Sequence, residues 1–194
     1  MACNTTSANV YDEYKNSFDY ILYPIIQTCA KVIAELDIKR LGVFATSATI
    51  ASGAYSREIK KYKQDIKIFE MSCPGWVQIV ENNKQDDDLS IELIKENLDR
   101  MLENNPDKII LGCTHYPFLL DVLSKFAPKD MFIDPSSYFA QYIKEDLENK
   151  NLLNDNTSGK ETFLVSANAS EFKQASKMFY NLKELPHIIN FATV

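Results

Sequence analysis

Short aliphatic runs alternate with amphipathic helical patterns along almost the whole chain, and this alternation constrains the fold more than any other feature. Residues 108–112 read KIILG, a buried-strand pattern, whereas residues 89–104 place Ile91, Ile94 and Leu98 on one helical face. Regular alternation of strand and helix predicts an α/β fold with a mostly parallel sheet. The predicted strands are residues 39–46, 65–71, 108–112, 131–134, 162–166 and 187–191. The predicted helices are residues 6–15, 24–36, 49–62 (capped by Thr49), a short segment ending at 81, 89–104, 117–126, 137–153 and 170–180, with a linker at 154–160.

The strongest local signal lies in residues 107–120, DKIILGCTHYPFLL. An aliphatic strand ends there at Gly112, and Cys113, Thr114 and His115 form a turn before a proline opens the next apolar period. Open α/β sheets bind ligands at the carboxyl ends of their strands. We therefore expect this turn to lie at a binding site.

The bulk composition is that of an ordinary globular protein and narrows the class of function. The 194 residues carry a net charge of −6, with a pI near 5.0, which argues against a nucleic-acid-binding surface. No apolar run reaches transmembrane length, and the first residues lack the basic and apolar regions of a signal peptide. The four cysteines are widely spaced and form no C-x-x-C pair, which favours a reduced, cytoplasmic protein.

Cys113 and His115 are the two residues of this turn whose side chains could take part in catalysis, as a thiolate and as a proton-transfer group. A cysteine at a helix start has its thiolate favoured by the helix dipole and by free backbone N–H groups. His115 can shuttle a proton near neutral pH, whereas His187, which follows Pro186 and precedes an apolar run, is interpreted as structural. A lone cysteine is more often buried and inert, but the Gly-Cys-Thr-His turn favours a functional role.

A second cysteine turn stands at the beginning of the chain, where Cys3 is followed by Asn4, Thr5, Thr6 and Ser7. One interpretation is a simple helix cap, because short hydroxyl and amide side chains often serve that purpose. The other is an anion site, since such side chains and free backbone N–H groups bind carboxylates. The pairing of this turn with Cys113 favours the second interpretation.

Metal and cofactor sites were weighed against these signals. Cys113 and His115, with Cys3 or Cys73, could contribute zinc ligands, but the C-x-x-C or H-x-x-x-H pairs typical of structural zinc are absent from the sequence. The sequence also has no G-x-G-x-x-G motif, no P-loop and no recognisable pyridoxal phosphate lysine. We expect neither a metal nor a cofactor.

Several segments in collinear order resemble the cofactor-independent aspartate/glutamate racemase family, and glutamate racemases in particular. The segments are CNTTSA at residues 3–8, ATSATIASGAYSREI at 45–59, CPGWVQIVE at 73–81, ILGCTHYPFL at 110–119, SYFAQYI at 137–143 and FLVSANASEFK at 163–173. The resemblance therefore covers essentially the whole chain.

The resemblance implies a two-base racemisation of L- and D-glutamate that supplies D-glutamate for peptidoglycan. Cys3 matches the cysteine that deprotonates D-glutamate, and Cys113 matches the cysteine on the opposite face of the substrate. His115 matches a histidine that assists the second cysteine, and Glu81 matches a carboxylate that orients this histidine. The positions that match substrate-binding residues are Asn4, Thr5, Thr46, Thr49 and Thr114.

The resemblance also implies two similar α/β domains with the active site in the cleft between them. Residues 1–24 plus 135–194 are expected to form the first domain, and residues 25–134 the second. The family's D-S-G-x-G-G and P-Y-G segments have no counterpart before Cys3, so the first domain is expected to be N-terminally truncated and the activity impaired. The expected partner is glutamate, without nucleic acid or membrane, and the resemblance allows a homodimer.

Three alternatives stay open at this point. One is an aspartate racemase, and another is a non-catalytic racemase-like fragment that binds a small anion or a protein partner. The third, a cysteine-dependent hydrolase, is disfavoured because no oxyanion-hole motif is evident and His115 lies too close in sequence to show that it is the base for Cys113.

Overall fold

The computed structural model describes residues 1–154, 159–177 and 179–190. Contacts divide the chain into two compact units, Met1–Leu152 and Leu153–Val194. The predicted racemase domains, residues 1–24 plus 135–194 and residues 25–134, do not coincide with these units, and their boundaries stay a prediction.

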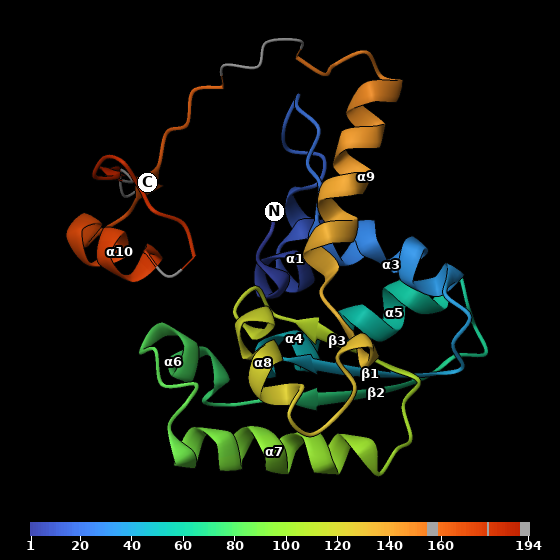
Figure 1. Cartoon of the computed structure of the whole chain (residues 1–194). Coiled ribbons are helices and arrows are strands. Elements are labelled where there is room, and N and C mark those ends of the chain that lie inside the picture. The colour runs from blue at the N-terminus through green and yellow to red at the C-terminus, as the bar shows by residue number, and fades with distance from the viewer. Residues whose placement is uncertain (155–158, 178, 191–194) are drawn as a thin grey trace. The chain divides into compact units, whose positions relative to one another are not determined.

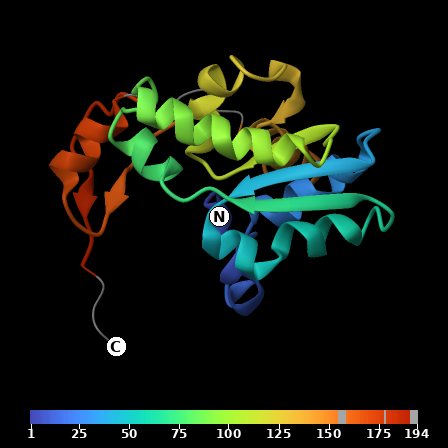
Figure 2. The same cartoon turned by 90° about the horizontal axis from the view of Figure 1, so that it is seen from below.

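The first unit is built on a four-stranded parallel sheet with the strand order β2-β1-β3-β4. The strands are β1 (Arg40–Ala45), β2 (Lys67–Ser72), β3 (Lys108–Gly112) and β4 (Phe132–Ile133). Viewed from the side of α7 (Asp88–Leu102), β1 and β2 run side by side at one edge of the sheet (Figure 2). The α/β class with a parallel sheet, predicted from the alternation of elements, is confirmed.

Helices cover both faces of this sheet, which places it between two hydrophobic layers (Figure 1). On one face, Phe44 and Leu111 pack with buried residues of α6 (Trp76–Glu81), α7 and α8 (Leu120–Leu123). On the other face, Val43 and Ile110 pack against α3 (Ile25–Glu35) and α5 (Ala54–Lys60), and α9 (Pro135–Asn149) packs on α3. Because neighbouring strand residues point to opposite faces, aliphatic runs such as LGVFA and IILG supply both layers at once.

The remaining elements of the first unit are short. They are α1 (Asn4–Asn9), α2 (Tyr11–Tyr14), α4 (Ser47–Ser52) and the 3₁₀ turns η1 (Tyr116–Leu119) and η2 (Lys129–Met131). The second unit contains the parallel pair β5 (Leu164–Val165) and β6 (His187–Ile188), together with α10 (Ala169–Ser176). His187 begins β6, and the predicted end of that strand at residue 191 lies outside the described residues.

Several predicted helices differ from the observed ones at their ends, and three of them also break or change type. The predicted helix 49–62 begins instead at Ser47 with Thr46 as its cap, and it is divided by Gly53, which has a left-handed φ of 60°. The predicted helix 6–15 begins at Asn4 and breaks at Val10, where α1 gives way to α2. The predicted helix 117–126 is a 3₁₀ turn followed by a single α-helical turn that ends at Leu123.

Candidate active site

Four strand ends meet along one edge of the sheet and place the candidate residues near one another. The register pairs Ala45 with both Ser72 and Gly112, so the residues that follow these three lie level at the carboxyl edge. They are Thr46, Cys73 and Cys113, and Asp134 follows β4 at the same edge. This is the edge at which open α/β sheets bind ligands.

Cys113, His115 and Glu81 form a connected series of ionisable groups. The Cys113 Sγ lies 3.7 Å from Nδ1 of His115, and the His115 Nε2 lies 3.2 Å from Oε1 of Glu81. Cys113 and His115 come from the turn after β3, whereas Glu81 is the last residue of α6, which packs against η1. Both ring nitrogens of the imidazole are therefore engaged, a geometry in which a carboxylate orients a histidine beside a thiol.

The surroundings of Cys113 favour its protonated form. Burial raises the pKa of the thiol, since only 8% of the residue is exposed, and this effect outweighs the backbone N–H of His115, which lowers the pKa. Negative charge on Cys3 and on Glu81 raises the pKa further. Asn4, which directly follows Cys3, lines the same pocket as Cys113, so the two cysteine turns lie in the same region.

The opposing turn presents Cys3 at the start of α1. Cys3 is exposed, has extended backbone angles and directly precedes Asn4, which is 3% exposed. The Asn4 Oδ1 accepts a hydrogen bond of 2.7 Å from the hydroxyl of Tyr55. Within the described residues, the Nδ2 of Asn4 has no hydrogen-bond partner. A buried amide with a free donor is a binding group for an oxygen-bearing ligand.

Three threonine hydroxyls form a closed cluster beside this turn. Thr5 Oγ1 lies 2.8 Å from Thr46 Oγ1 and 3.1 Å from Thr49 Oγ1, and the latter two are 2.9 Å apart. The cluster joins α1 to the start of α4, where Thr46 Oγ1 also accepts from the backbone N–H of Thr49 at 3.3 Å. Since hydroxyl hydrogens rotate, these groups can donate to one another or to a bound anion.

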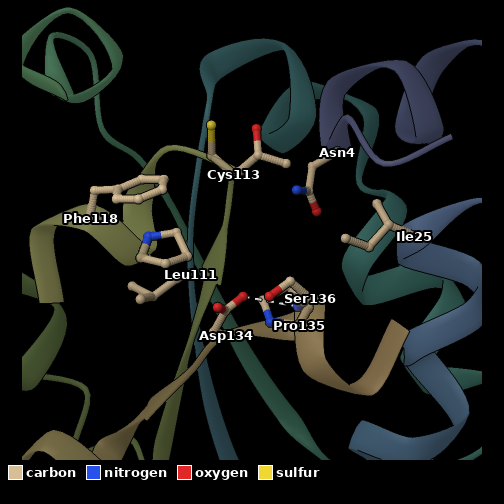
Figure 3. A pocket seen from close by; sticks show the side chains of 10 residues that line it. Asn4, Ile25, Leu111, Cys113, Phe118, Asp134, Pro135 and Ser136 are labelled. Atoms are coloured by element: carbon tan, nitrogen blue, oxygen red, sulfur yellow. Dashed lines mark hydrogen bonds between the residues drawn. The ribbon is translucent and has the colours of Figure 1, made fainter. Parts of the chain in front are cut away.

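A pocket of about 250 Å³ opens beside Cys113. Figure 3 shows Asn4 and Ile25 on one side of it, Phe118 and Leu111 on the other, and Asp134 at its floor. Its lining consists of Asn4, Ile25, Leu111, Cys113, Thr114, Pro117, Phe118, Asp134, Pro135 and Ser136.

Apart from Cys3, the predicted site residues therefore fall into three groups. Asn4, Cys113 and Thr114 line the pocket; His115 and Glu81 extend from Cys113; and Thr5, Thr46 and Thr49 form the hydroxyl cluster. Cys3 stands at the start of α1 and is not one of the pocket-lining residues.

Asp134 and Tyr55 were not predicted from the sequence. The same rule that singled out Cys113 could have found Asp134, because both residues follow a strand directly. Tyr55 gives no local signal of this kind, because its contact with Asn4 joins residues that are far apart in the sequence.

The described part of the chain also bears on metal binding and on membrane association. Among these residues, no group of three or more His, Cys, Asp and Glu side chains is arranged to hold a metal ion. None of the described helices has the length and apolar character needed to cross a membrane.

Comparison with known proteins places this arrangement in a family. The family model described as Asp/Glu/Hydantoin racemase matches residues 1–143. The glutamate racemase of Trichodesmium erythraeum is 31% identical over 191 residues, which cover 98% of this chain and 70% of the relative.

Solved structures that are similar to this chain include two glutamate racemases. The crystal structure of the Francisella tularensis glutamate racemase in complex with D-glutamate is 28% identical and matches 99% of this chain and 72% of its own, with a TM-score of 0.87. A glutamate racemase isoform from Bacillus anthracis, 24% identical over the same shares of both chains, has a TM-score of 0.88 and shows the shared fold. With its fold, the family match and its relatives in agreement, the chain belongs to the Asp/Glu/hydantoin racemase family.

Proposed function

We propose that this protein is a glutamate racemase that uses Cys3 and Cys113 as its two acid–base groups. The observation that carries the proposal is the series Cys113–His115–Glu81 at the carboxyl edge of the sheet, beside a pocket that Asn4, the residue after Cys3, also lines. Two similar proteins support glutamate as the substrate. The Trichodesmium erythraeum relative is named as a glutamate racemase, and the Francisella tularensis glutamate racemase was solved in complex with D-glutamate.

Inversion at the α-carbon needs a base on one face of the substrate and an acid on the other. In the L-to-D direction, the thiolate of Cys113 takes the α-proton and leaves the electron pair on the α-carbon. The thiol of Cys3 then gives its proton to the opposite face, which yields D-glutamate, a Cys3 thiolate and a Cys113 thiol. The reverse reaction exchanges the two roles, so two groups of the same kind serve both directions.

The other site residues act on charge and position. Negative charge that develops at the α-carbon spreads onto the α-carboxylate, where hydrogen-bond donors stabilise it. Asn4 offers its free Nδ2, and Thr114 lines the same pocket. We assign Thr5, Thr46 and Thr49 to binding of the substrate's polar groups, and His115 to proton exchange with Cys113 under the orienting influence of Glu81.

The proposal is tested by following racemisation through circular dichroism and α-proton exchange through proton NMR in deuterated water. The wild-type chain should interconvert both glutamate enantiomers and act more slowly on aspartate. Cys3→Ala and Cys113→Ala should each lower racemisation by about a thousandfold or more, within the usual range for loss of a general base. Each variant should still exchange the α-proton of the one enantiomer that faces its remaining cysteine.

A matched control is Cys29→Ala, because Cys29 is a buried cysteine whose thiol donates to the carbonyl of Pro135, 3.4 Å away. This variant should retain racemisation. If the wild-type chain neither racemises glutamate nor exchanges its α-proton, a non-catalytic racemase-like protein is the better description. Faster turnover of aspartate than of glutamate would instead contradict the proposed substrate.

Finer features of the proposal concern location, assembly and pathway. Four free cysteines fit a reducing compartment, so we place the enzyme in the cytoplasm, where its product would serve peptidoglycan synthesis.

We also propose a homodimer, supported by the stacked and exposed rings of Phe18 and Tyr20. The assignment of residues 1–24 and 135–194 to one racemase domain, and of 25–134 to the other, is part of the same proposal.

A further inference from the structure

Tyr55 connects the two cysteine turns from a fully enclosed position. It lies on α5, is 2% exposed, and belongs to the hydrophobic layer that α3 and α5 form on the sheet. Its hydroxyl donates to Oδ1 of Asn4, the residue after Cys3. A buried tyrosine needs a partner for its hydroxyl, and here the partner is a residue of the candidate site.

The hydrogen bond from Tyr55 decides how the Asn4 amide is oriented. An amide has an oxygen that accepts and a nitrogen that donates, and a buried hydroxyl that occupies the oxygen fixes which atom points elsewhere. The Nδ2 of Asn4 is consequently left without a protein partner in the described structure, and Asn4 lines the pocket beside Cys113. In Figure 3 the amide of Asn4 faces the interior of that pocket.

The ring of Tyr55 also packs against the backbone that precedes Cys113. A Cβ placed on Gly112 would lie 2.9 Å from Cε2 of Tyr55 and 2.8 Å from the carbonyl oxygen of Phe44. The close approach of ring and strand therefore requires a glycine at this position. The side chain of Tyr55 thus contacts Asn4, which follows Cys3, and Gly112, which precedes Cys113. Asn4 and Gly112 are 108 residues apart in the chain.

The hydroxyl of Tyr55 keeps its proton throughout the useful pH range. Complete burial raises the pKa of this phenol well above its ordinary value, and negative charge on Cys29 and Cys113 acts in the same direction. The neutral phenol therefore retains the proton that it donates to Oδ1 of Asn4.

We infer that Tyr55 is a positioning residue of the racemase site, which holds the Asn4 amide with its Nδ2 directed at an oxygen of the bound amino acid. This inference rests on the proposed function and deepens it, since it names the group that orients one of the substrate-binding residues. Tyr55 itself does not touch the substrate; it acts through Asn4 and, by packing on Gly112, through the turn that carries Cys113.

The test removes the hydroxyl alone, with Tyr55→Phe, and measures KM and kcat together. Loss of one buried hydrogen bond should raise the KM for D-glutamate about 10-fold while kcat falls less, because binding is affected more than proton transfer. In an Asn4→Ala background the same change should have no further effect on KM, since the amide that it orients is gone. Thermal unfolding followed by circular dichroism confirms that each variant is folded.

The matched control is Tyr116→Phe, which also removes a buried hydroxyl with a hydrogen bond, here to the carbonyl of Cys73 at 3.2 Å. It should lower stability to a similar extent as Tyr55→Phe and leave KM unchanged. A KM shift of equal size in both variants, or an undiminished effect of Tyr55→Phe in the Asn4→Ala background, would overturn the positioning role.

Binding of D-glutamate, measured by calorimetry, separates this inference from the proposed function. A wild-type chain that binds D-glutamate without racemising it contradicts the proposed function. In that case a higher Kd for Tyr55→Phe than for wild type supports the inference, and an equal Kd contradicts it. A wild-type chain that racemises glutamate, with Tyr55→Phe unchanged in both KM and Kd, contradicts the inference alone. A wild-type chain that does not bind D-glutamate contradicts both.

Discussion

Cys113 is buried against an imidazole, whereas Cys3 stands exposed at the start of a helix. The thiol of Cys113 has His115 at 3.7 Å and Glu81 behind the ring, and its surroundings hold the proton on sulfur. The side chain of Cys3 makes no capping hydrogen bond to α1, and its neighbours are the amide of Asn4 and the threonine cluster. One thiol thus lies buried beside an imidazole, and the other lies exposed at a turn rich in amide and hydroxyl side chains.

The contrast bears on the proposed mechanism, in which the two cysteines alternate between thiol and thiolate. A racemase needs one thiol and one thiolate at a time, and equal surroundings would favour neither assignment. Burial of Cys113 favours the thiol there, and in the proposed mechanism this is the enzyme form that accepts D-glutamate and donates from Cys113. The imidazole then offers a route by which Cys113 can lose that proton in the reverse direction.

Apart from the two cysteine substitutions, the largest expected effect comes from removing the imidazole with His115→Asn. Loss of a proton-transfer group should lower racemisation by about 100-fold. The enantiomers have equal free energies, so kcat/KM must fall equally in both directions. The difference between the two regions should appear instead in α-proton exchange, which should fall for L-glutamate, deprotonated by Cys113, and persist for D-glutamate. Equal loss of exchange for both enantiomers, measured by NMR, would contradict the assignment of His115 to Cys113.

The second prediction concerns the reactivity of the two thiols. At neutral pH, iodoacetamide should modify Cys3 about 10-fold faster than Cys113, because alkylation requires an accessible thiolate. Since burial raises the pKa of Cys113, its thiolate and therefore its alkylation rate should increase as the pH rises beyond the ordinary thiol range. Peptide mapping by mass spectrometry measures both rates. Faster modification of Cys113 at neutral pH would contradict the difference in exposure between the two cysteines and the raised pKa of Cys113.

A smaller effect is expected when the orienting charge is removed with Glu81→Gln. The side chain of Glu81 is 56% exposed, so its interaction with His115 is partly screened by solvent. Racemisation should fall roughly 5-fold, and the difference from wild type should shrink as the salt concentration rises. Glu92→Gln, an exposed carboxylate on α7, provides the control and should leave the rate unchanged. An effect as large as that of His115→Asn would mean that Glu81 does more than orient the ring.

The smallest effect concerns the stability of the Cys3 region. Thr46→Ala removes the side-chain cap of α4 together with a hydrogen-bond partner of Thr5. Loss of a helix cap typically lowers the free energy of unfolding by about 1 kcal/mol. Urea unfolding measures the change, and Ser47→Ala, an exposed neighbour in the first turn of the same helix, should alter stability much less. Equal changes in both variants would show that the cap contributes little.

The sequence was informative where the signal was local. Residues 108–112 were predicted as a strand with the boundaries that β3 has, and α6 follows Gly75 and ends at Glu81 as expected. Hydrophobic periodicity carries such information because each buried face recurs every two residues in a strand or every three to four in a helix. The cap of α4 was missed because Thr46 and Thr49 are equally suitable residues, and the structure uses Thr46.

By itself, the sequence determined the alternation of strands and helices and the position of Cys113, Thr114 and His115 directly after a buried strand. The tertiary structure decided which other distant groups meet, such as Thr5 with Thr46 and Tyr55 with Asn4. The physical reason is that periodicity reports on the local environment of each residue. Contacts across tens of residues depend instead on the parallel strand order, which brings separate strand ends to one edge.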